Sequence, residues 1–212
     1  MKKKLVTEKE IIEFAKGGGR YFALAKNMVI TPLAADRIKT LNIILTTEEE
    51  IKSKQEKNTV PFKKIAIGGD HTGFKVKQSL IKFLKEKGME VNDIGTYNEE
   101  PADYPVFAAK AAKLVQKGEA DGAILIDATG IPSAITANKF KGIRAVTCYN
   151  EFSARSAREH NNANILVVGG VTLGEGTIKG IIEIFLTTAF AGGRHQKRLE
   201  IITQIESENF RN

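Results

Sequence analysis

The chain contains one cysteine, no tryptophan, three histidines and no apolar run long enough to span a membrane. A single cysteine, Cys148, excludes an internal disulfide and a zinc site built from cysteines. The lysine-rich start is not followed by the apolar stretch of a signal peptide, and no segment predicts a transmembrane helix. We therefore expect a cytoplasmic protein with no membrane partner.

The 212 residues carry a formal charge of +7, which comes from 32 Lys and Arg against 25 Asp and Glu. The excess is spread among neighbouring acidic and basic residues and is not gathered in a stripe interleaved with aromatic residues. We therefore predict no nucleic-acid partner. A positive field of this kind instead favours the approach of an anionic substrate.

From residue 63 onward, short apolar runs alternate with stretches of helical periodicity. This alternation is typical of a parallel sheet covered by helices on both faces. Residues 59–212 are therefore predicted to form an α/β domain, a Rossmann-like three-layer fold with a five-stranded parallel sheet. The expected strands lie at 64–68, 90–94, 122–126, 144–148 and 164–168, and the expected helices at 72–87, 105–117, 151–158, 174–190 and 194–207.

Residues 1–58 differ in pattern and are predicted to be a small α+β appendage that docks the protein onto a larger assembly. Thr7-Glu8-Lys9-Glu10 is a capping box that opens a helix. Its apolar side chains, Ile11, Ile12 and Phe14, are the expected contact points, since a short helix must bury such a face. Short strands are expected at 21–24, 28–30 and 43–45, a helix from Pro32 to about Leu41, and a charged linker at 46–58.

All three histidines lie in short polar motifs: G-G-D-H-T-G-F at 68–74, R-E-H-N-N at 158–162 and G-G-R-H-Q-K-R at 192–198. The first motif follows an apolar run and is expected in the loop after a strand, where ligands bind in such sheets. Arg194 and Arg198 are four residues apart at the start of a helical pattern, so both can face one phosphate. The alternative is that these two arginines are only solvated surface charges.

Together with A-D-Y-P at 102–105, A-N-K at 137–139, G-I-R-A-V at 142–146 and E-H-N-N-A-N at 159–164, these motifs resemble the ribose-5-phosphate isomerase B and galactose-6-phosphate isomerase family. The resemblance runs from about Lys63 to Glu206. It implies interconversion of a phosphorylated aldose and ketose through a cis-enediolate, without metal or other cofactor. It also implies a homodimer or homotetramer whose active sites are shared between subunits.

The resemblance assigns roles to individual positions. His160 would open the sugar ring, a step that suits a side chain able to give and take a proton near neutral pH. Arg194 and Arg198 would clamp the phosphate across a subunit boundary. The implied catalytic residues are Asp127, Thr129 and His160, and the implied substrate-binding residues are Asp70, His71, Tyr104, Gly130, Ser133, Asn138, Asn161, Arg194 and Arg198.

The loop at 126–133 departs from the family pattern. Isomerase B enzymes commonly carry a cysteine where this chain has Asp127, and that cysteine moves the proton between carbons. A carboxylate in a desolvated pocket can move the same proton. Pro132 lacks the N–H that an enediolate oxygen would use, and the Ser133 hydroxyl could replace it. Two hypotheses follow: an active isomerase with Asp127 as base, and a catalytically impaired or partner-dependent subunit that binds sugar phosphate.

Overall fold

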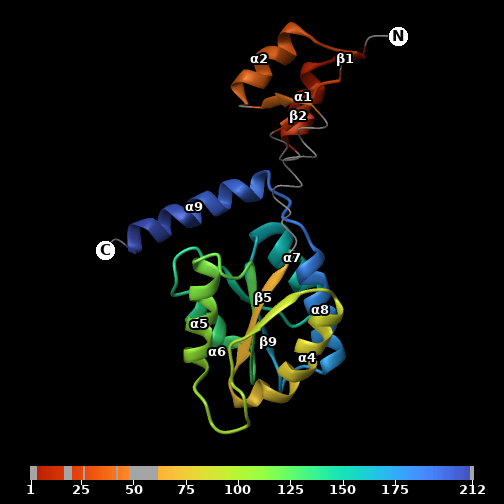
Figure 1. Cartoon of the computed structure of the whole chain (residues 1–212). Helices are drawn as coiled ribbons and strands as arrows, with labels where there is room; N and C mark the ends of the chain where they lie inside the picture. Colours follow the sequence, from red (N-terminus) through yellow and green to blue (C-terminus); the bar gives the residue numbers. More distant parts are fainter. Residues whose placement is uncertain (1–3, 17–20, 26, 42, 48–61, 211–212) are drawn as a thin grey trace. The chain divides into compact units, whose positions relative to one another are not determined.

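The computed structural model describes residues 4–16, 21–25, 27–41, 43–47 and 62–210 (Figure 1). Most of the predicted linker lies outside these residues. The chain divides into two compact units, Met1–Val60 with Gly192–Glu200, and Pro61–Ala191 with Ile201–Asn212. The functional division at residue 58 stays a prediction.

The larger unit contains the five-stranded parallel sheet that the sequence predicts. Its strands pair in the order β6-β5-β7-β9-β8, and every neighbouring pair is parallel. The α/β fold class is therefore confirmed. The strands are β5 (Lys64–Gly69), β6 (Glu90–Asp93), β7 (Gly122–Asp127), β8 (Ala145–Thr147) and β9 (Ile165–Gly169).

Helices follow the strands in the predicted alternation, with one addition. The helix α6 occupies Ile131–Ala137, where the sequence predicted only a loop. Pro132 falls in its first turn, where a missing N–H costs no helical hydrogen bond. The other helices of this unit are the 3₁₀ turn η1 (His71–Gly73), α4 (Phe74–Glu86), α5 (Tyr104–Gln116), α7 (Glu151–Asn161) and α8 (Glu175–Thr187), and α9 (Arg194–Asn209) ends the described chain.

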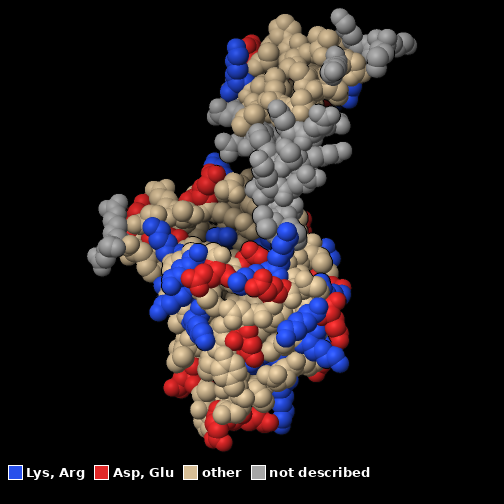
Figure 2. Space-filling view, viewed as in Figure 1, with Lys and Arg blue, Asp and Glu red and all other residues tan. Residues whose placement is uncertain are grey.

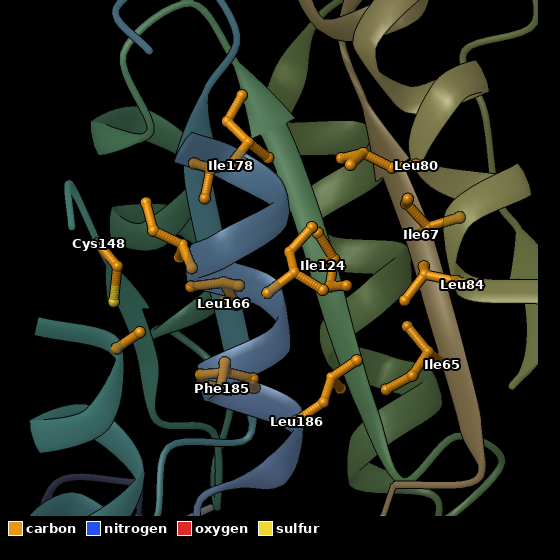
Figure 3. Close-up of a cluster of buried hydrophobic side chains, with 14 of the residues drawn as sticks. Ile65, Ile67, Leu80, Leu84, Ile124, Cys148, Leu166, Ile178, Phe185 and Leu186 are labelled. Atoms are coloured by element: carbon orange, nitrogen blue, oxygen red, sulfur yellow. The ribbon is translucent and has the colours of Figure 1, made fainter. Parts of the chain in front are cut away.

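The core forms two layers, one on each face of the sheet. Side chains alternate across a strand, so neighbouring residues of the central strands enter different layers. Ile65, Ile67 and Ile124 pack against Leu80 and Leu84 of α4, as Figure 3 shows, in a cluster that also includes residues of α7 and α8. On the other face, alanines and aliphatic residues of the strands pack against α5 and α6. This arrangement gives the three layers that the sequence predicts.

The described residues 4–47 of the smaller unit form two consecutive β-α-β halves. The first is β1 (Lys4–Val6), α1 (Glu8–Lys16) and β2 (Tyr21–Ala23), and the second is β3 (Met28–Ile30), α2 (Pro32–Thr40) and β4 (Ile44–Thr46). Equivalent strands pair in parallel, β1 with β3 and β2 with β4. Both helices begin in the same way, because the hydroxyls of Thr7 and Thr31 accept hydrogen bonds from the N–H of Glu10 and Ala34. The strand β1 was not expected from the sequence.

Of the three expected contact points of the appendage, Ile11 is wrong, and Ile12 and Phe14 are partly buried and stay predictions. Ile11 is fully buried in the unit's own core, with Val6, Ala34, Ile38 and Ile43. Phe14 packs against this core and stacks edge-on with Phe22 at 5.1 Å. The apolar face of α1 therefore serves the unit's internal packing.

Candidate active site

The loops after β5 and β7 lie side by side at the carboxyl edge of the sheet. The chain leaves β5 toward β6 on one side and leaves β7 toward β8 on the other, so the order of connection reverses between these two neighbours. Such a reversal is where open α/β sheets bind ligands. The approach is close: a Cβ added to Gly69 would lie 1.9 Å from the carbonyl oxygen of Ile126. Only glycine fits there.

Asp70 and His71 lie in the first of these loops, as the sequence predicts. The Asp70 side chain is nearly buried, and its Oδ1 accepts hydrogen bonds from the N–H and the hydroxyl of Thr72. It therefore caps η1 and fixes the backbone that presents His71.

The imidazole of His71 is held by the loop that follows β6. Its Nδ1 accepts a hydrogen bond from the N–H of Ala102 at 3.2 Å and lies 3.4 Å from the Ala102 carbonyl oxygen. Of these two contacts the shorter is the one with the N–H, and an Nδ1 that accepts from it carries no proton, which assigns the proton of the neutral ring to Nε2. Tyr104 begins α5 two residues later and is partly buried. The structure thus brings Asp70, His71 and Tyr104 to one edge of the sheet.

The second loop is organised by Asp127, which ends β7 and is fully buried. Its Oδ1 accepts hydrogen bonds from the N–H of Thr129, at 3.0 Å, and of Gly130, and its Oδ2 accepts one from the N–H of Ser133 at 3.1 Å. Gly130 has a φ of +84°, which a larger residue rarely adopts. The carboxylate therefore gathers the first N–H groups of α6 around itself.

Two of the predicted binding residues have other partners in the structure. Both ends of the Asn138 side-chain amide bond to the backbone of Ala145, at 2.8 Å each, and this holds α6 to β8. The role of Asn138 in substrate binding stays a prediction. Ser133 is buried, and its N–H is already taken by Asp127. Thr129 and Gly130 lie in the loop between β7 and α6. Thr129 is partly buried, and Gly130 is buried.

His160 and Asn161 lie at the other edge of the sheet. The helix α7 starts after β8 at the carboxyl edge and runs back toward the start of β9. Its last residues contact the segment before β8: Nε of Arg144 donates to the carbonyl oxygen of Asn161 at 3.1 Å. One chain therefore does not bring His160 to the loops of Asp70 and Asp127. Nδ1 of His160 lies 3.3 Å from the Ser156 hydroxyl, and Nε2 lies 4.0 Å from a Glu159 carboxylate oxygen.

A buried arginine supports this end of α7. The Nη1 atom of Arg158 donates to Oδ1 of Asn162 at 2.9 Å and to the carbonyl oxygen of Ala163 at 2.6 Å. Its guanidinium also lies over the ring of Phe62, 4.6 Å from the centroid. Burial, and secondarily the charge of Arg144, lowers the pKa of Arg158 to about 10, so the group remains charged near neutral pH.

Arg194 and Arg198 lie in the first turns of α9, in the segment that groups with the smaller unit. Both side chains are exposed, and Nε of Arg194 lies 3.4 Å from Nε2 of His195. They share one helix, as the sequence predicts. Their role as a phosphate clamp stays a prediction.

The sequence predicted that Cys148, the single cysteine, lies within the strand at 144–148. In the structure it lies one residue beyond the end of β8. Burial raises the pKa of the Cys148 thiol to about 11, against the smaller lowering effect of a hydrogen bond with Ser153. The thiol is therefore protonated near neutral pH and is no substitute for a cysteine at position 127.

Within the part of the chain that the structure describes, no group of three or more His, Cys, Asp or Glu residues is placed to hold a metal ion. None of the described helices is both long and apolar enough to cross a membrane. On the face shown in Figure 2, basic and acidic side chains are interspersed, which agrees with the charge pattern of the sequence.

One functional signal in the sequence was missed. Lys77 lies on α4 at helical spacing from Leu80 and Leu84, and it is as deeply buried as they are. A lysine at this spacing within an apolar stripe indicates a paired buried charge. Its partner is Asp93, the last residue of β6.

A family model described as Ribose/Galactose Isomerase matches residues 65–202. Ribose-5-phosphate isomerase B of Escherichia coli is 47% identical over 144 residues, which cover 68% of this chain and 97% of that protein. Galactose-6-phosphate isomerase subunit LacB of Clostridium acetobutylicum is 39% identical over 142 residues, 67% of this chain and 81% of that one. The structure of Clostridium thermocellum ribose-5-phosphate isomerase B superposes with a TM-score of 0.68 at 44% identity, covering 69% and 99% of the two chains.

Proposed function

Because this chain belongs to the ribose/galactose isomerase family of sugar-phosphate isomerases, we propose that it interconverts a phosphorylated pentose or hexose aldose and its ketose through a cis-enediolate. The resemblance that the motifs indicated is thereby confirmed. The observation that carries the proposal is the pairing of the Asp70-His71 loop with the Asp127 loop at adjacent strand ends.

The residues at the carboxyl edge provide the sugar-binding part of the site. We assign contact with the sugar to Asp70, His71 and Tyr104, because rigid backbone elements hold all three at the switch point of the sheet. The Nε2–H of His71 is a donor for a sugar or phosphate oxygen, since Nδ1 is already engaged with Ala102. Thr129 and Gly130 border the same loop.

Ring opening by His160 requires a second copy of the chain. His160 and Asn161 lie at the opposite edge of the sheet from Asp127, so a site that includes all of them must be shared between subunits. We propose a homodimer, or a homotetramer built from such dimers. Large apolar side chains exposed on α6 and at the start of α7 (Ile131, Ile135 and Phe152) support an interface beside the carboxyl edge. In this arrangement the exposed Arg194 and Arg198 clamp the substrate phosphate.

Asp127 occupies the position of the proton-transfer base. Its Oδ2 accepts only one hydrogen bond from the described residues and keeps a lone pair for a carbon-bound proton, but Asp127 is fully buried, so proton transfer requires the loop to move and expose this oxygen. A second candidate function is favoured by the same loop. Three N–H groups already bind the carboxylate, as expected of a structural anchor. In that case the chain binds sugar phosphate and depends on a partner for proton transfer.

One experiment separates these two functions. The purified chain is incubated with pentose and hexose phosphates in deuterated water, and exchange at the carbon next to the carbonyl is followed by NMR. Exchange by the chain alone supports an isomerase with its own base. Binding without exchange supports the partner-dependent subunit, and the absence of both rejects a sugar-phosphate site.

We also propose a cytoplasmic location and a docking role for residues 1–58. Since Ile11 and Phe14 are used in the appendage's own core, docking would use the apolar side chains that it leaves exposed, among them Leu5, Val29 and Leu33. Leu5 and Val29 are paired neighbours on β1 and β3. Light scattering of the full chain and of a Leu33→Glu variant, alone and in extracts, tests this role: an unchanged assembly size would reject it.

A further inference from the structure

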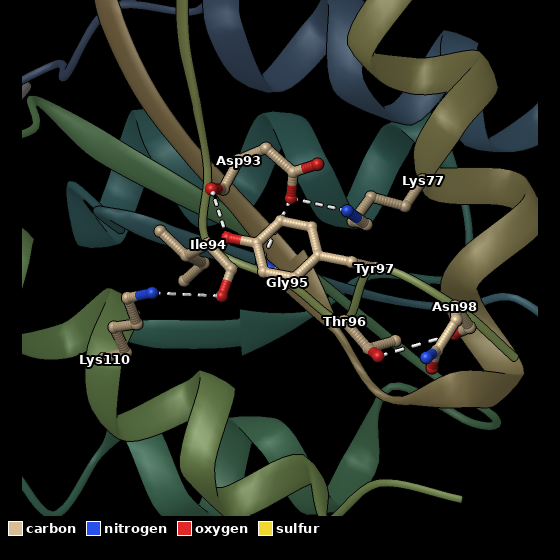
Figure 4. A network of polar contacts seen from close by, with 8 residues as sticks. All are labelled: Lys77, Asp93, Ile94, Gly95, Thr96, Tyr97, Asn98 and Lys110. Carbon is tan, nitrogen blue, oxygen red and sulfur yellow. Dashed lines mark hydrogen bonds and ion pairs between the residues drawn. The ribbon is translucent and has the colours of Figure 1, made fainter. Parts of the chain in front are cut away.

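A buried lysine lies behind the first loop of the candidate active site. Lys77 of α4 is fully inaccessible to solvent, and its Nζ bonds to Oδ1 of Asp93 at 2.5 Å (Figure 4). The ammonium also lies 5.4 Å from the ring centroid of Tyr97 and 5.9 Å from that of Phe74. A buried charge is costly unless it is paired, so Lys77 constrains Asp93 strongly.

Asp93 in turn anchors the loop that leaves β6. The same Oδ1 accepts a hydrogen bond from the N–H of Gly95 at 3.0 Å, and the backbone carbonyl of Asp93 accepts one from the Tyr97 hydroxyl at 3.1 Å. Lys110 of α5 donates to the carbonyl oxygen of Ile94 at 3.3 Å. The start of the loop is therefore tied to α4, through Lys77, and to α5.

This loop touches the Asp70-His71 segment on two sides. Gly69, which precedes Asp70, donates to the carbonyl oxygen of Gly95 and accepts from the N–H of Thr96, both at 2.9 Å. At its other end the loop supplies the N–H of Ala102 to Nδ1 of His71. Each contact depends on the path that the loop takes after Asp93.

We propose that Lys77 and Asp93 are positioning residues for His71. Their ion pair fixes the loop, the loop holds the N–H of Ala102 against Nδ1 of His71, and the imidazole proton is thereby kept on Nε2. His71 then presents a fixed donor to an oxygen of the sugar phosphate. The inference deepens the proposed function, since it rests on contact between His71 and the substrate.

The chain offers a matched control for this ion pair. Lys75 and Glu99 form a second pair between the same helix and the same loop, at 3.0 Å, but both side chains are largely exposed. Exposed ion pairs contribute little to the stability of the fold. Lys75→Met therefore removes a charge next to the loop and leaves the Lys77–Asp93 anchor intact.

The test uses the full-length protein and two readouts. The chain has only three histidines, so the imidazole ¹⁵N signals of His71 can be assigned with a His71→Asn variant. Wild type and Lys75→Met are expected to show a protonated Nε2 and an unprotonated Nδ1. Lys77→Met is expected to show mixed tautomers, together with a loss of about tenfold or more in kcat/KM for substrate exchange, as expected for a misplaced substrate-contacting group.

The outcomes separate the inference from the function on which it rests. If Lys77→Met does not fold, as judged by circular dichroism, the double variant Lys77→Met/Asp93→Asn removes both charges and serves instead. An unchanged tautomer of His71 in the folded variant overturns the inference, whatever the activity. If the wild type exchanges no sugar phosphate, the proposed function fails, and the ¹⁵N signals still decide whether Lys77 positions His71.

Discussion

The carboxylate of Asp127 accepts a hydrogen bond from the N–H of Ser133, six residues further along the chain, at 3.1 Å. With the N–H groups of Thr129 and Gly130 on its other oxygen, it closes the loop between β7 and α6. The residue that we propose as the proton-transfer base is thus also the anchor of the loop between β7 and α6. Substitutions at this position must therefore be judged by both stability and rate.

Asp127→Asn is expected to abolish deuterium exchange and to leave sugar-phosphate binding largely intact, because the size is kept and the basicity is lost. An amide can accept through only one of its two ends, so the N–H of Ser133 loses its partner. The free energy of unfolding should fall by about 1–3 kcal/mol. NMR measures the deuterium exchange, and urea titration measures the free energy of unfolding.

Asp127→Cys distinguishes the two roles of this residue. A thiol could supply proton transfer but accepts hydrogen bonds weakly, so the Asp127→Cys variant should have a lower free energy of unfolding, whether or not its exchange rate rises.

Full exchange activity in the Asp127→Asn variant would show that the Asp127 carboxylate is not the base.

The phosphate clamp predicts a second result. Replacing Arg194 or Arg198 by alanine should weaken sugar-phosphate binding by about 1.5–3 kcal/mol, the range for a hydrogen bond to a charged group. Gln196→Ala is the control, since Gln196 is exposed on the same helix but lies two residues from each arginine, and residues two apart do not share a helix face. Calorimetric titration with the phosphorylated sugar measures all three. Equal affinities for all variants would remove the arginines from the site.

The sheet could be predicted from the sequence because its central strands are buried on both sides. Runs such as Ile165–Val168 are apolar at every position, and strands of that kind fit only between two helical layers. The helix α6 could not be predicted, because Gly130-Ile131-Pro132 has the composition of a turn. Its start depends on the carboxylate of Asp127, which a reading of local pattern does not include.

The candidate site was predictable only in part, for a similar reason. Asp70 and His71 follow a strand, so their edge of the sheet was given by the alternation of strands and helices. The position of His160 at the opposite edge follows from the same alternation, because α7 runs back from the end of β8 to the start of β9, but the motif around His160 does not show it. Asn138 carries a family motif, yet its amide bonds to Ala145. Motif matching does not show which polar groups the fold has already paired.

Cys148 provides a prediction with a defined pH range. Burial raises its pKa from 9.0 to about 11, so the folded state binds more protons than the unfolded state between these values. The contribution of the thiol to stability is therefore complete below pH 9 and is lost as the pH rises toward 11, by an amount on the order of 1–3 kcal/mol. The difference in absorbance near 240 nm between the wild type and Cys148→Ala, which cancels the tyrosinate signal, should show the high midpoint in buffer and a normal one in urea.

The same residue tests the chemistry of the site. Cys148→Ala should retain exchange activity, and iodoacetamide at pH 8 should leave the folded protein active, because the thiol is buried and protonated. Rapid inactivation by the reagent would mean that Cys148 reaches the substrate.

The packing of the appendage predicts a fourth result. Ile11→Ala should lower the stability of that unit by about 2–5 kcal/mol, since a fully buried aliphatic side chain is lost. Leu33→Ala, in which the removed side chain is 64% exposed, should change it by less than about 0.5 kcal/mol. Hydrogen exchange of the amides of residues 4–47 measures both. Unchanged protection in the Ile11 variant, with loss of a larger assembly, would make Ile11 a contact point after all.

The separation of His160 from Asp127 within one chain leads to a test by complementation. His160→Asn and Asp127→Asn should each be inactive. If two chains share each site, a mixed dimer of the two variants contains one site with both defects and one site with none. Co-expression of differently tagged variants, with random pairing, should therefore restore about a quarter of the wild-type rate. Each variant paired with itself is the control and should stay inactive. Were the site confined to one chain, every chain in the mixture would still carry a defect, and no exchange would return.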